Sequence, residues 1–177
     1  MNFTKPDSLF NFGMKVSIYS EKNSEKTSEK EEKSGWYKGG EHISYYLNGI
    51  RKDMNYFSKG FYTLSFSYKF LHDDDTVYFA YSYPYTYSDL LNDIYEIEND
   101  NIKRTVVSRK LLCKSLAGYD CDVITITEKG DFHTMQAKKA IIISARVHPG
   151  EVVGSWMMRG VLLFLTDMEN EEAKLLR

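Results

Sequence analysis

AIIISARV, at residues 140–147, leads directly into His148-Pro149-Gly150-Glu151. The nearly continuous apolar run is typical of a strand that is covered on both faces, as strands of parallel sheets are. A helix-like stretch follows it. In open α/β sheets, ligands bind at the carboxyl ends of such strands. His148 and Glu151 are three residues apart at that point, so these two side chains could hold one metal ion from one side.

The pair can also be explained without a metal. His148 stands where an N-cap or loop residue would precede a helix, and Glu151 in a first helical turn would bond backbone N–H groups and gain from the helix dipole. The position of the pair favours metal binding, because Gly150 allows the backbone to come close to a bound ligand and Pro149 suits the first turn of a helix. Zinc in hydrolases takes three protein ligands, His₂Glu among them, and keeps a position for water. No histidine follows Glu151, so the chain offers only part of such a set.

The other histidines are weaker candidates for a third ligand. His72 precedes Asp73-Asp74-Asp75, which we expect to be a solvated turn, because the run lacks the loop length and the distal Glu of an EF-hand calcium site. His133 lies in a polar loop before the apolar run. His42 is expected on the surface of a strand.

The chain after Leu111 is predicted to open an α/β domain. Residues 121–127 read as a strand with alternating apolar positions, residues 129–131 turn the chain, and residues 140–147 form the second strand. Residues 173–177 begin a further helical stretch. The helix after Pro149 presents a broad apolar face, formed by Trp156, Met157, Gly160, Val161, Phe164 and Leu165.

The chain before Leu111 is predicted to be antiparallel β-structure, since most of its 14 Tyr and 10 Phe gather there and aromatic side chains pack well across strands. Strands are expected at 14–19, 61–70 and 76–83. The last two are expected to pair as a hairpin, because strict alternation leads into the aspartate turn between them. Ser88 is expected to be the N-cap of a short helix.

Residues 20–34 interrupt this pattern with a Ser-Glu-Lys motif that repeats every four residues. The segment has no apolar side chain to bury, so burial cannot offset the entropy of ordering it. We predict a disordered insertion. A docking tail of mixed charge is the functional alternative.

Composition limits the classes of function. The net charge of −2 gives no reason to expect nucleic acid binding or attachment to a membrane surface. No run is long and apolar enough for a membrane helix, and no early stretch reads as a signal peptide. Cys113 and Cys121 are too loosely spaced for a zinc knuckle, and we expect them to be small, buried, reduced residues of a cytoplasmic protein. Redox activity of the two thiols is the functional alternative.

These observations predict a mixed β and α/β fold. Residues 1–110 would form a partial, antiparallel β-sandwich-like domain that contains the 20–34 insertion. Residues 111–177 would form the first strands and helix of an α/β domain, and we expect that domain to be truncated, because two strands and one helix leave edges uncovered.

The chain resembles the cytosolic carboxypeptidases, which are zinc metallocarboxypeptidases that trim glutamates, chiefly from tubulin. The resemblance to their zinc-binding segment rests on ARVHPGE at 145–151, SWMMRG at 155–160 and Phe164-Leu165. The resemblance to their amino-terminal β-sandwich rests on KPDSL at 5–9 with Gly13-Met14, GWYKGG at 35–40 and VYFAYSYPYTYSDL at 77–90.

The resemblance implies that His148 and Glu151 are two ligands of one Zn²⁺. It places the third ligand, the substrate-binding arginines and the glutamate general base beyond this sequence, so no catalytic residue is expected within the chain and the chain alone is predicted to be inactive. It also implies a hydrolase of the cytoplasm that acts on glutamate-rich tails such as those of tubulin and associates with microtubules. The alternative is a non-catalytic β interaction module or a pseudoenzyme fragment.

Overall fold

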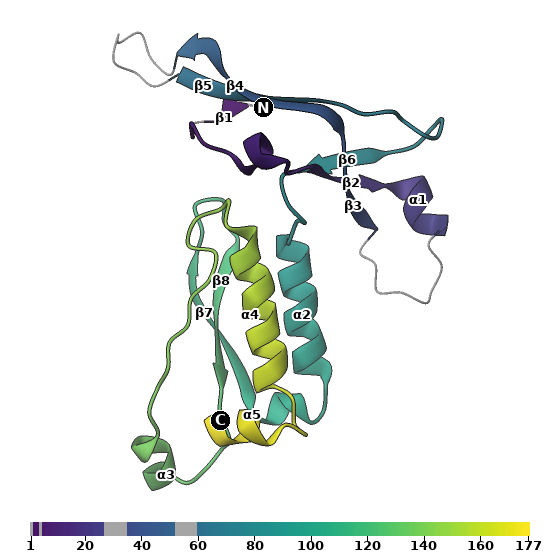
Figure 1. The fold of residues 1–177 in the computed structure, drawn as a ribbon. Coiled ribbons are helices and arrows are strands. Elements are labelled where there is room, and N and C mark those ends of the chain that lie inside the picture. The colour runs from purple at the N-terminus through teal and green to yellow at the C-terminus, as the bar shows by residue number, and fades with distance from the viewer. Residues whose placement is uncertain (1, 4, 27–34, 52–59) are drawn as a thin grey trace. The chain divides into compact units, whose positions relative to one another are not determined.

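The computed structural model describes residues 2–3, 5–26, 35–51 and 60–177 (Figure 1). They form two compact units, Met1–Tyr83 and Pro84–Arg177. Antiparallel sheets and helices together confirm the mixed class of the fold. The predicted domains, residues 1–110 and 111–177, stay a prediction. The β-sandwich form of the first domain stays a prediction as well.

The first unit consists of two three-stranded antiparallel sheets. Their strand orders are β1-β5-β4 and β3-β2-β6. Two helical segments accompany them, the 3-10 helix η1 (Leu9–Phe12) and α1 (Glu21–Lys26). The strands are β1 (Asn2–Phe3), β2 (Val16–Ser20), β3 (Trp36–Gly39), β4 (Glu41–Arg51), β5 (Gly60–Ser67) and β6 (Val77–Ala80).

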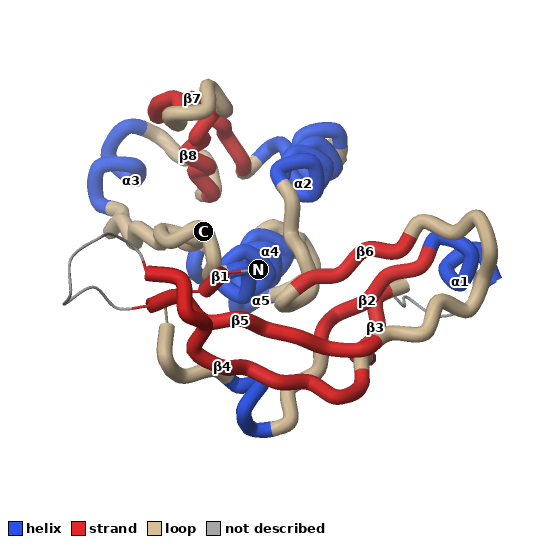
Figure 2. The backbone as a smooth tube through the Cα atoms, turned by 90° about the horizontal axis from the view of Figure 1, so that it is seen from above, coloured by secondary structure: helices blue, strands red, loops and turns tan. Residues whose placement is uncertain are grey.

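The predicted hairpin between 61–70 and 76–83 is wrong, although a strand forms in each range. β5 pairs with β4, and β6 pairs with β2 in the other sheet (Figure 2). The two strands meet through side chains instead, because the ring of Phe79 lies 5.3 Å from that of Phe66 and 5.2 Å from that of Tyr68. Alternation identifies a strand and its apolar face, but it does not select the partner that receives its backbone hydrogen bonds.

β2 forms the core of the first unit and confirms the strand predicted there. Ile18 is fully buried, and Val16 is 3% exposed. Ser17 and Ser20 are buried as well, so both faces of this central strand are covered. The Ser20 hydroxyl donates a 2.6 Å hydrogen bond to the Asp75 carboxylate, which lowers the pKa of that carboxyl.

The expectation of disorder over 20–34 is incorrect for its first part. Residues 21–26 form α1, and residues 27–34 lie outside the described residues. α1 is fastened to the aspartate turn, since the Lys22 backbone N–H donates to Asp75 at 3.1 Å and the Lys22 ammonium donates to the Asp73 carbonyl at 2.7 Å. These polar contacts order the segment without burying an apolar side chain, which composition could not reveal.

The second unit packs helices against one antiparallel hairpin. β7 (Val107–Lys114) pairs with β8 (Asp120–Ile126), and β8 confirms the strand predicted at 121–127. Buried Ile94, Ile97 and Leu162 form the core where two of the helices meet the hairpin. The helices are α2 (Tyr87–Asn99), the 3-10 helix η2 (Lys103–Thr105), α3 (Phe132–Ala137), α4 (Val152–Leu165) and α5 (Glu171–Leu176).

The predicted buried strand at 140–147 is wrong. These residues form no strand, and Ile141 and Ile142 are 78% and 93% exposed. A strand of this kind needs neighbours on both edges and cover on both faces. Within the described residues no strand pairs with it, and the sheet of the second unit consists of β7 and β8 alone.

The predicted apolar face of α4 is also revised. The helix begins at Val152, so Pro149 lies in the turn before it. Leu162 is its buried residue, whereas Trp156 and Met157 from the predicted face are 41% and 70% exposed. Because α4 is apolar nearly all round, its sequence does not single out the side that packs.

The predicted burial of the two cysteines is wrong as well. Cys113 is exposed and Cys121 is half-buried, and neither forms a disulfide in this structure. They lie on β7 and β8, and Leu111 and Leu112 of β7 are exposed too.

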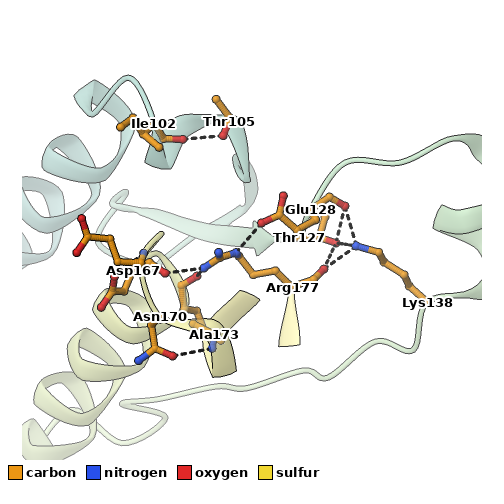
Figure 3. Close-up of polar contacts among 11 residues, drawn as sticks. Ile102, Thr105, Thr127, Glu128, Lys138, Asp167, Asn170, Ala173 and Arg177 are labelled. Carbon is orange, nitrogen blue, oxygen red and sulfur yellow. Dashed lines mark hydrogen bonds and ion pairs between the residues drawn. The ribbon is translucent and has the colours of Figure 1, made fainter. Parts of the chain in front are cut away.

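Arg177 joins the end of α5 to the loop after β8 (Figure 3). Its guanidinium is buried, pairs with Glu128 at 3.0 Å, and donates to the Leu165 and Asp167 carbonyls at 2.9 Å each. Its own carbonyl accepts hydrogen bonds from the Lys138 ammonium at 2.6 Å and from Thr127. The sequence predicted helix at 173–177 but gave no sign of this cluster.

α2 and α4 lie side by side and are joined by a polar cluster beneath the Trp156 ring. The Tyr85 hydroxyl donates to Asp93 at 2.6 Å, and the Arg159 guanidinium pairs with the other oxygen of Asp93 at 2.9 Å. Tyr85 is buried, and burial followed by the bond to Asp93 raises the pKa of its phenol. Trp156 contacts the Tyr85 ring edge-on at 5.2 Å.

Replacing Asp93 with alanine should destabilise the second unit. The change leaves Arg159 and the buried Tyr85 hydroxyl without their acceptor, and we expect a loss of about 2–4 kcal/mol in the free energy of unfolding, measured by urea denaturation. Tyr85→Phe should cost about 1 kcal/mol, because it removes one bond of the cluster. Asn92→Ala at an exposed position of α2 serves as control, and an equal effect of Asn92→Ala and Asp93→Ala would contradict the prediction.

Candidate metal-ligand pair

His148 and Glu151 come together in the turn that precedes α4. The His148 imidazole Nδ1 and the Glu151 carboxylate Oε1 are 2.8 Å apart. The Glu151 backbone N–H donates to the His148 carbonyl at 3.1 Å, which closes the turn. Both side chains are open to solvent, with 75% and 58% of their surfaces exposed. Within this turn, the spacing of three residues therefore brings the two predicted ligands into contact.

Glu151 does not play the capping role that the metal-free interpretation gave it. It is the N-cap residue of α4, with φ −87° and ψ 59°, and its side chain makes no cap hydrogen bond. The carboxylate is turned to His148 instead. The Glu151 side chain thus pairs with His148 and does not cap the helix.

Arg146 fastens this turn to the rest of the second unit. Its Nε donates to the Pro149 carbonyl at 2.8 Å, and its Nη1 donates to the Tyr85 carbonyl at 3.0 Å and the Ser155 hydroxyl at 3.2 Å. Its backbone is left-handed, with φ +58°, which is costly for a residue with a side chain. A Cβ on Gly154 would lie 3.3 Å from the Arg146 nitrogen, so that glycine allows the close approach.

The donor atoms of the pair fit zinc, which is bound in proteins by imidazole nitrogen and carboxylate oxygen. Among the described residues no group of three or more His, Cys, Asp or Glu is arranged to hold a metal ion. His148 and Glu151 can therefore supply two ligands but not a complete site of the structural kind.

The other histidines lie elsewhere. His42 is exposed at the start of β4, and the ring of His72 shares a 2.8 Å hydrogen bond with Asn23. His133 lies in α3, where we had expected a loop, and its ring meets that of Phe132 edge-on. The predicted aspartate turn is confirmed.

Comparison with known proteins identifies relatives over the whole chain. Cytosolic carboxypeptidase 3 of Mus musculus is 40% identical over 178 residues, which cover all of this chain and 16% of the relative. Cytosolic carboxypeptidase 2 of Danio rerio is 40% identical over 178 residues, with all of this chain and 23% of the relative covered. Cytosolic carboxypeptidase 2 of Homo sapiens is 38% identical over 178 residues, with all of this chain and 19% of the relative covered.

The chain thus spans less than a quarter of the length of each of these relatives. No protein-family model matches it. No solved structure matches it either.

The left-handed backbone of Arg146 makes a specific prediction for two substitutions. Arg146→Ala loses three hydrogen bonds and keeps the strained φ, whereas Arg146→Gly loses the bonds but relieves the strain. We expect the glycine variant to be more stable than the alanine variant by about 1 kcal/mol in urea denaturation. The same pair at exposed Lys139, which has no positive φ, should show the opposite order. Greater stability of Arg146→Ala would mean that the turn has another backbone conformation.

Proposed function

Because the chain belongs to the cytosolic carboxypeptidase family, we propose that it is part of a zinc metallocarboxypeptidase that removes glutamates from protein tails. Similarity to carboxypeptidases along the entire chain is the observation that carries this proposal. The contact between His148 and Glu151 supports it, because it joins an imidazole and a carboxylate in one solvent-accessible turn.

In this proposal His148 and Glu151 hold the zinc ion, and Arg146 fixes the turn that carries them. Zinc, when bound, polarises the scissile carbonyl and lowers the pKa of its water. The residues of this chain contribute the placement of the ion. The third ligand, the general base and the substrate-binding groups are assigned to parts of the enzyme beyond this sequence.

The proposed substrates are glutamate-rich tails, with those of tubulin as the foremost candidates, so the protein would act in the cytoplasm and associate with microtubules. The relatives are named cytosolic, which supports that location. In the portion of the chain that is described, no helix has the length and apolar character to cross a bilayer. The net charge of −2 supports no role for nucleic acid or a membrane surface.

A non-catalytic interaction module is the second candidate. Three tyrosines in β6 and in the segment that follows it favour an interaction module, since Tyr78, Tyr81 and Tyr83 are 49%, 43% and 42% exposed. Tyrosines of this kind anchor many protein interfaces. Binding of a tubulin-tail peptide that is lost in Tyr81→Ala and retained in His148→Ala would favour the module over the enzyme.

The chain should bind zinc weakly and through His148. Complete four-ligand sites bind zinc with about 10–16 kcal/mol, and two protein ligands leave much of the coordination to water, so we expect a Kd above about 1 μM. Competition with a chromophoric chelator measures it. His148→Ala and Glu151→Gln should each weaken binding further, and His72→Ala should not. Sub-micromolar affinity that survives His148→Ala would show that other residues bind the metal.

A chimera tests the catalytic role directly. Danio rerio cytosolic carboxypeptidase 2, with its aligned segment replaced by residues 139–165 of this chain, should keep its carboxypeptidase activity on a glutamate-ended peptide. His148→Ala in the chimera should abolish that activity because a zinc ligand is lost, while Lys139→Ala should not. This chain by itself should release no glutamate. An active His148→Ala chimera, or chelator-sensitive turnover by this chain alone, would contradict the assignment.

A further inference from the structure

The β7–β8 hairpin holds the two cysteines of the chain opposite each other. Cys113 on β7 and Cys121 on β8 are direct partners in the antiparallel register. The loose spacing in sequence hid this arrangement, because the turn after Lys114 brings the two positions face to face. The pair lies outside the metal-ligand turn.

The register is compatible with a covalent bond between the sulfurs. Directly opposed residues of antiparallel strands have Cα atoms about 4.5 or 5.5 Å apart, depending on the type of pair. Disulfides span Cα separations of about 4.4–6.8 Å. The pairing is irregular between Leu111 and Cys113, so β7 has local freedom beside the pair to accommodate a change in sulfur geometry.

Access to the thiols is unequal, which suits a reactive pair. Cys113 is exposed and can meet a small oxidant directly. Cys121 is half-buried, and burial together with the neighbouring Cys113 thiol raises the pKa of Cys121, which keeps it protonated. Lys114 and Asp120 are the next pair of opposed residues toward the turn, and their ion pair holds the two strands together there.

We propose that Cys113 and Cys121 form a reversible dithiol switch that hydroperoxides oxidise to a disulfide across the hairpin. The Cys113 thiolate attacks a peroxide oxygen, the O–O bond breaks, and Cys113 becomes a sulfenic acid while hydroxide leaves and is protonated to water. The Cys121 thiol then attacks that sulfur and releases the second water. Overall, two thiols and one H₂O₂ give one disulfide and two waters. Two molecules of a small thiol such as glutathione return the pair to its reduced form by exchange.

Oxidation would tie residues 113 and 121 together and fix the register next to the irregular pairing. Amide hydrogen exchange in β7 and β8 should therefore become slower, because opening of the hairpin would no longer separate the strands. The effect does not depend on zinc or on peptidase activity, so it can fail or succeed independently of the proposed function.

The experiment treats the full chain with hydrogen peroxide, blocks remaining thiols, and maps the tryptic peptides without reduction. Cleavage after Lys110, Lys114 and Lys129 separates the two cysteines, so a disulfide appears as residues 111–114 linked to 115–129. We expect this linked pair from monomeric protein, at a rate that does not change on dilution, and its loss on adding glutathione. Amide exchange in 107–126 should be slower in the oxidised protein.

Two single variants separate the roles of the sulfurs. Cys121→Ser should stop at a Cys113 sulfenic acid, which dimedone traps, whereas Cys113→Ser should react much more slowly. Links between chains, over-oxidation of Cys113 without a link, or a link that glutathione cannot reverse would each overturn the proposal. The wild-type peptide map decides the question even where a variant does not fold.

Discussion

A β-strand keeps its place only when another strand takes up its backbone hydrogen bonds, and the architecture of this chain follows from that requirement. β2 satisfies it on both edges, with β3 on one side and β6 on the other, and its residues are the most deeply buried of the first unit. β8 satisfies it with β7. Residues 140–147 are at least as apolar as either strand, yet most of them are exposed, and in the described part of the chain no strand pairs with them.

This distinction explains how much of the fold the sequence could predict. Local patterns located β2, β5 and β8, because alternation is a property of a single strand. They could not predict that β5 and β6 belong to different sheets, because pairing is decided between segments. The helix start was a local signal that was missed. Thr86 has Asp89 three residues later and forms a capping box, whereas Ser88 has Leu91 at that position and cannot.

The features of the candidate site also divide into those that the sequence could predict and those that it could not. His148 and Glu151 are neighbours in the turn, so the sequence was enough to predict their association. The role of Arg146 could not be predicted from the sequence, because it depends on a hydrogen bond to the Tyr85 carbonyl, which is far away in sequence. It also depends on a left-handed backbone conformation, which the residue type arginine does not indicate. The cysteine pair escaped for a related reason, since two residues eight positions apart become partners only once the hairpin has formed.

The surroundings of the metal-ligand pair bear on its chemistry. A surface helix usually carries polar residues on its outer side, but α4 exposes Val153, Met157 and Trp156 there. Residues 140–147 on the other side of the pair expose Ile141 and Ile142. Both flanks of His148 and Glu151 thus have sequences suited to burial. A zinc ion held between covered apolar flanks would act in a medium of low dielectric constant, where its charge stabilises a developing oxyanion more strongly than in water. The apolar run at 140–147 is therefore consistent with the proposed metal centre, in which His148 and Glu151 would be enclosed.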